Sequence, residues 1–71
     1  MSPDQLKKIF TYHKPDSDQS RQYDNIRNAA YEFAKVVLEN TPPSADQTTA
    51  IRKIREAVMT ANASIALGGE F

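Results

Sequence analysis

The chain has 71 residues, with nine basic and nine acidic side chains, one histidine and no cysteine. The lack of cysteine excludes disulfides and thiolate metal sites, and a single imidazole gives no histidine cluster for zinc. The balanced charge argues against a protein that binds DNA or RNA polymers, because such proteins rely on a basic field. A core in so short a chain rarely supplies more than about 3–5 kcal/mol, so we expect the domain to form a homo-oligomer.

Residues 1–15 are predicted to form an N-terminal segment that contains a short helix. A serine followed by a proline is typical of a helix start, and this helix is expected to run through Phe10. The segment ends in the stretch FTYHKP, residues 10–15, which places two aromatic rings and the only histidine just before the next helix.

A long helix is predicted over residues 16–40. Its apolar side chains alternate at spacings of three and four residues, which places them on one stripe: Tyr23, Ile26, Ala30, Phe33 and Val37. Asp16 with Gln19 three residues later has the form of a capping pair. Pro42 and Pro43 each restrict the preceding residue, so a turn is expected over residues 41–43.

A second long helix is predicted over residues 44–67. The same spacing recurs in a second stripe: Ile51, Ile54, Val58, Ala61 and Ile65. Ser44 and Gln47 form another capping box, and Gly68 with Gly69 gives a stop signal. No convincing strand is present. The fold class is therefore all-α, an antiparallel two-helix hairpin with a short N-terminal helix, which we expect to assemble into a compact homo-oligomer.

Apolar and small side chains also lie beside the two stripes. Several apolar residues fall partly outside the seam between the helices: Ala34, Val36, Leu38, Met59 and Leu67. Ala50, Ala57 and Ser64 form a small-residue edge where another helix can approach, and the opposite edge carries Arg55 and Asn62. Such surface is typical of contacts with partner chains, although single exposed apolar residues are ordinary in any protein.

The sequence offers little for catalysis. His13 has no nucleophile elbow, cysteine or glycine-rich phosphate loop beside it, and the acidic residues near position 16 lack the pattern of a calcium loop. We therefore expect no enzyme, no metal and no cofactor. No apolar run approaches the roughly 20 residues of a membrane span, so no membrane partner is expected.

Four side chains remain open to a role in ligand binding. Tyr12 can stack on a base or, with Phe10, plug the open end of the hairpin, while His13 can be a solvated neighbour. Arg27 can hold an anion or pair with the acid one turn before it. Asn62 can set the register between helices or donate to a ligand at an interface.

Three stretches, FTYHKP, YDNIRNAAYEFAKVVLENTPPS and IRKIREAVMTANASIAL, together resemble the hairpin domain of phage anti-CBASS cyclic-nucleotide sponges. Phage sponges that disarm the Thoeris system share this domain. The resemblance runs from about Phe10 to Leu67 and implies a compact hexamer in the cytoplasm of the infected bacterial host. It implies immune evasion by sequestering cyclic dinucleotides such as cyclic GMP-AMP, and cyclic trinucleotides in some relatives, without cleaving them.

The resemblance also assigns roles to particular residues. Tyr12 matches the base-stacking tyrosine of the family, Arg27 matches a phosphate-contacting basic residue, and His13 occupies a neighbouring position that can be polar. Leu67 stands where relatives often carry arginine, which predicts weak or absent trinucleotide binding. The alternative function is a helical adaptor or structural oligomer that docks a host protein.

Overall fold

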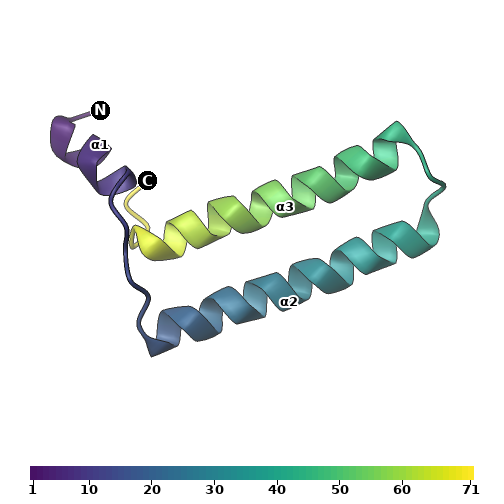
Figure 1. Ribbon diagram of the computed structural model, residues 1–71, viewed down its shortest axis with the longest axis horizontal. Coiled ribbons are helices and arrows are strands. Elements are labelled where there is room, and N and C mark those ends of the chain that lie inside the picture. The colour runs from purple at the N-terminus through teal and green to yellow at the C-terminus, as the bar shows by residue number, and fades with distance from the viewer.

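A computed structural model describes all residues from 1 to 71 and contains three helices and no strand. The helices are α1 (Pro3–Ile9), α2 (Ser17–Asn40) and α3 (Ala45–Ala66). Figure 1 shows α2 and α3 running side by side in opposite directions, joined by a short turn at one end, with α1 and both termini at the other end. The all-α hairpin with a short N-terminal helix is therefore confirmed.

The start of α2 is fixed by the capping pair that the sequence predicts. The Gln19 amide nitrogen donates to Asp16 Oδ1 at 2.7 Å, and the Asp16 amide nitrogen donates to Gln19 Oε1 at 3.1 Å. Ser2 and Gln5 make the same reciprocal pair at the start of α1. Each cap satisfies backbone donors that have no partner inside the helix, and removing one typically costs about 0.5–2 kcal/mol.

The box predicted at the start of α3 is only half formed. Ser44 Oγ accepts from the Gln47 amide nitrogen at 3.1 Å. The side-chain amide of Gln47 turns the other way and donates to the carbonyl and hydroxyl oxygens of Thr41, both at 3.1 Å. The Gln47 side chain thus links the first turn of α3 to Thr41, the C-cap of α2. It gives the Thr41 carbonyl oxygen a hydrogen-bond partner that it would otherwise lack.

The end of α3 follows the glycine signal. Leu67 is the C-cap, and Gly68 and Gly69 take φ values of 64° and 74°, in the left-handed region where a side chain is strained. The Gly69 amide nitrogen donates to the Ser64 carbonyl at 2.9 Å, which satisfies one of the last carbonyls of the helix.

The seam between α2 and α3 is formed mostly by small and β-branched side chains that are half-buried: Tyr23, Ile26, Ala30, Ala34 and Val37 on α2, and Ala50, Ile51, Ile54, Val58, Ala61 and Ile65 on α3. Phe33 is 59% exposed but lines the space between α2 and α3, as its place on the stripe predicts, whereas Ala34, expected partly outside the seam, is half-buried. Both positions continue the stripe after Ala30, at spacings of three and four residues. Phe33 lines a groove on one side of the seam, and Ala34 lines a groove on the other side.

No residue in the chain is buried. Val36, Leu38 and Met59 are 52%, 56% and 61% exposed, as their position outside the predicted stripes implies. Two helices bury a single seam, and a chain of this length has no disulfide to compensate. The apolar surface that remains is the kind that partner chains cover. None of the helices is both long enough and apolar enough to cross a bilayer.

Helix α1 packs against neither α2 nor α3. It is held at the open end of the hairpin by polar contacts, including an ion pair between Lys8 and Glu70 near the C-terminus. Nearby, the Gln19 side chain donates to the Ile65 carbonyl at 3.4 Å and links the start of α2 to the end of α3. The contacts that hold α1 at the open end are therefore an ion pair and hydrogen bonds.

Candidate functional site

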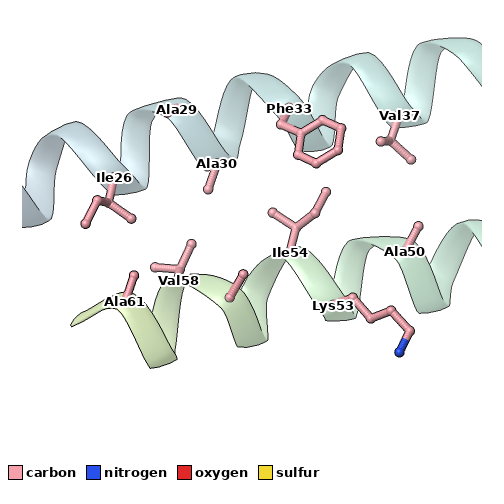
Figure 2. A pocket seen from close by; sticks show the side chains of 11 residues that line it. Ile26, Ala29, Ala30, Phe33, Val37, Ala50, Lys53, Ile54, Val58 and Ala61 are labelled. Carbon is pink, nitrogen blue, oxygen red and sulfur yellow. The ribbon is translucent and has the colours of Figure 1, made fainter. Parts of the chain in front are cut away.

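The hairpin has a groove on each side of its seam. We call the first the apolar groove; it encloses about 600 Å³. Its lining contains a single charged residue: Ile26, Ala29, Ala30, Phe33, Val37, Ala50, Lys53, Ile54, Ala57, Val58 and Ala61. Figure 2 shows Phe33 and Ile54 pointing toward one another from opposite helices, while the Lys53 side chain extends away from α2. Ala50 and Ala57, from the predicted small-residue edge, both lie in this groove.

We call the second the cationic groove; it encloses about 290 Å³. It shares three seam residues with the apolar groove and is lined by Arg27, Ala30, Tyr31, Ala34, Ile51, Ile54, Arg55, Val58 and Met59. Two guanidinium groups, one from each long helix, border it, and no acidic residue is among its lining. An apolar floor with a few placed charges is the usual composition of a site for a small ligand.

Arg27 forms an ion pair with Asp24, one turn earlier on α2. The two side chains are 69% and 58% exposed, so water screens the pair and it adds little to stability. The Arg27 guanidinium therefore lines the cationic groove and remains accessible to an anion in solution.

Tyr12 lies in the link between α1 and α2, and its side chain is 81% exposed. Phe10, two residues earlier, is 82% exposed. The hypothesis that these rings plug the open end of the hairpin is wrong for the single chain. Both rings project from a link that ends at Pro15, just before the capped start of α2, so each offers a free aromatic face.

His13 is half-buried and contacts the end of α1. Its Nε2 lies 2.8 Å from the carbonyl oxygen of Lys8. A carbonyl oxygen only accepts, so Nε2 carries the proton and donates this hydrogen bond. One ring nitrogen of His13 thus helps to fix the link against α1, which leaves Nδ1 as the nitrogen available to a ligand.

Asn62 lies on α3 near the open end and is half-buried. Its Oδ1 atom is buried and has no hydrogen-bond partner. The hypothesis that Asn62 sets the helix register through a hydrogen bond has no such bond to support it in the single chain. An unpartnered buried acceptor costs about 1–3 kcal/mol, and nothing within the single chain offsets this cost at Asn62.

The four predicted residues lie on three segments of the chain: Tyr12 and His13 in the link, Arg27 on α2 and Asn62 on α3. None of the four hydrogen-bonds to another, and Arg27 is the only one of them that lines the cationic groove. Sequence reasoning overlooked Tyr31, which is 66% exposed and lies in that groove. A signal for it exists in the sequence, because Tyr31 follows Arg27 by four residues and a helix places such pairs on one face.

Comparison with known families agrees with this architecture. The sequence matches the family model described as the Acb2/Tad1 hairpin domain over residues 2–66, nearly the whole chain. A search of curated proteins and a search of solved structures each return no match. The match covers α1, both arms of the hairpin and the link that carries Tyr12. The protein therefore belongs to the Acb2/Tad1 hairpin family of anti-CBASS and anti-Thoeris sponges, which are binding proteins for cyclic nucleotide signals rather than enzymes.

Proposed function

We propose that this chain binds and sequesters cyclic dinucleotides such as cyclic GMP-AMP, without cleaving them, in the cytoplasm of a phage-infected bacterium. Sequestration keeps the messenger from the CBASS effectors that it activates. Beyond family membership, the observation that carries this proposal is the Tyr12 ring, 81% exposed on a link fixed at both ends. An exposed large ring with no core contact to maintain is available to a ligand.

Stacking is the interaction that this ring is suited to make. A base stacked on an aromatic side chain contributes about 1–3 kcal/mol, whichever base it is. The hydrogen bond from His13 to Lys8 ties the segment that carries the ring to the end of α1, and the Asp16 cap fixes the point where the link meets α2. A ring on a fixed segment loses little conformational entropy on binding, so more of the stacking energy appears as affinity.

Arg27 is the proposed phosphate contact. A guanidinium binds phosphate through paired, charge-assisted hydrogen bonds, and these are stronger than neutral ones. The ligand phosphate has to compete with Asp24 for the same group, but that pair is exposed and weak. Releasing Asp24 to water therefore costs little compared with the stabilisation that the hydrogen bonds to phosphate provide.

A homo-oligomer, a hexamer by resemblance to the family, is proposed as the form that completes the site. A cyclic dinucleotide has two bases and two phosphates with near two-fold symmetry, and a two-fold interface presents each side chain twice. Tyr12 and Arg27 from two chains then match the ligand parts one for one. The apolar groove is the surface proposed for a second copy of the chain, since its lining holds only one charged residue, Lys53.

Thermal melting with added nucleotide tests the proposal. A ligand that binds only the folded state stabilises it by RT ln(1 + [L]/Kd), about 2.7 kcal/mol at a hundredfold excess over Kd. Cyclic GMP-AMP is expected to raise the melting temperature, and the linear dinucleotide, as a matched control, to raise it less. Denaturing the complex should release intact cyclic nucleotide.

Two outcomes would contradict the proposal. No shift with any cyclic dinucleotide would favour the alternative of a helical adaptor that docks a host protein. Recovery of linear products from the denatured complex would instead indicate a phosphodiesterase.

A further inference from the structure

Arg55 is the second guanidinium of the cationic groove. It lies on α3, while Arg27 lies on α2, so the two cations border one groove from opposite arms of the hairpin. The sequence pattern alone puts Arg55 on an edge of its helix. The structure adds that this edge faces the residue proposed above to bind phosphate.

The charge of Arg55 is not neutralised within the chain. Arg21 and Arg27 on α2 each pair with an aspartate three residues earlier, whereas Arg55 forms no ion pair. The helix neighbours of Arg55 at three and four residues include no acid: Ile51, Arg52, Val58 and Met59. An exposed guanidinium without an acid at the border of an apolar groove is free to bind an anion.

Tyr31 completes the chemistry of the groove. Its ring is 66% exposed, and it lies one turn after Arg27 on the same face of α2. An aromatic face, an apolar floor and two cations together complement a molecule that carries both bases and phosphates. The apolar groove has a different lining, with one charged residue, and an uncharged surface of a partner complements it better.

The charged side chains in each groove determine whether a second chain or an anionic ligand is the better occupant. A second copy of the chain laid over the cationic groove would desolvate two guanidinium groups that have only Asp24 nearby, which is costly unless acids arrive with it. The apolar groove carries no such penalty, since Lys53 extends away from α2. The occupant that fits the cationic groove is therefore an anion with apolar rings, not an apolar helix.

We infer that Arg55 is a second phosphate-binding residue, and Tyr31 a second stacking ring, of the cyclic-nucleotide site that includes Arg27. This inference rests on the proposed function and extends it to residues on both arms of the hairpin. The ligand contacts α3 as well as α2, so binding holds the two arms together.

Calorimetry with cyclic GMP-AMP at several salt concentrations tests the inference. Arg55→Ala is expected to weaken binding by about tenfold or more and to reduce its salt dependence, because a charged hydrogen bond is lost. Arg52→Ala is the matched control, since it removes the same guanidinium from the same helix and lines neither groove; it should change affinity by less than about twofold. Tyr31→Ala is expected to weaken binding by about fivefold or more.

Equal affinity of Arg55→Ala and the parent, or equal losses in Arg55→Ala and Arg52→Ala, would overturn the inference. If Arg55→Ala changes the sedimentation of the protein, Arg55→Gln replaces it, since it keeps most of the side-chain length without the charge. A parent protein that binds no cyclic nucleotide would instead refute the proposed function. The two failures are thus distinguishable.

Discussion

Replacing Tyr12 by alanine separates a ligand-binding ring from a structural one. The side chain is 81% exposed, so its removal deletes no core contact of the single chain, and the melting temperature without ligand should stay near that of the parent. If each of two Tyr12 rings stacks on one base of the ligand, the loss is about 1–3 kcal/mol per base, so the Kd rises roughly 5- to 150-fold for each base that loses its ring. Tyr12→Phe keeps the aromatic face and should retain most of the affinity.

Phe10→Ala is the matched control for this experiment. Phe10 is 82% exposed, lies two residues away on the same link, and has no proposed ligand role. Calorimetry with cyclic GMP-AMP gives the affinity of each variant, and a melting curve gives its stability. A Tyr12→Ala protein that binds as tightly as the parent but melts at a lower temperature would refute the stacking role and make the ring structural. Equal losses of affinity in the Tyr12→Ala and Phe10→Ala proteins would show that Tyr12 has no specific stacking role and that binding depends on the conformation of the link.

Three other predictions concern the grooves and the end of α3. Ala57→Leu should overpack the apolar groove where a second chain covers it, at a cost of about 1–3 kcal/mol, and lower the assembly state in sedimentation; an unchanged oligomer would mean that this surface faces solvent. Asn62→Leu removes a buried oxygen that has no partner, so the free energy of unfolding should rise by up to about 1–3 kcal/mol while nucleotide affinity falls. A lower melting temperature would show that the amide has a structural partner in the assembly. Cyclic tri-adenylate should bind more weakly than cyclic GMP-AMP, or not at all, because Leu67 is uncharged; tight binding by titration would contradict this.

The local features of the fold were predictable from the sequence because they depend on residues close together in the chain. The Asp16 cap needs only Gln19 three residues on, and both take the expected hydrogen bonds. The end of α3 needs only Gly68 and Gly69, whose positive φ values the sequence anticipates. The hairpin itself follows from two apolar stripes separated by a double proline.

Features that depend on how one helix meets another were harder to predict. Phe33 and Ala34 both continue the stripe of α2, and only the crossing with α3 decides that Ala34 enters the seam. Gln47 has the spacing of a capping box, yet a carbonyl of the turn offers its side chain another acceptor. A spacing shows which acceptors are within reach, not which one is used.

The candidate site was harder still to predict, because it depends on how whole chains meet as well as on how two helices meet. The sequence singled out Tyr12 and Arg27, which lie in the link and on α2, whereas Tyr31 is a candidate because it lines a groove together with Arg27. Periodicity shows which side chains share a face of a helix. It does not show which faces a second chain covers, so a site built from several chains stays a prediction until the assembly is observed.

Native mass spectrometry of the protein with a panel of cyclic di- and trinucleotides tests the central claim most directly. It reports the number of chains, the identity of the ligand and the stoichiometry in one spectrum. The proposed function predicts a homo-oligomer, a hexamer by family resemblance, that carries intact cyclic dinucleotide and releases it unchanged on denaturation. A folded monomer that retains no cyclic nucleotide, at concentrations where the oligomer is expected, would contradict it.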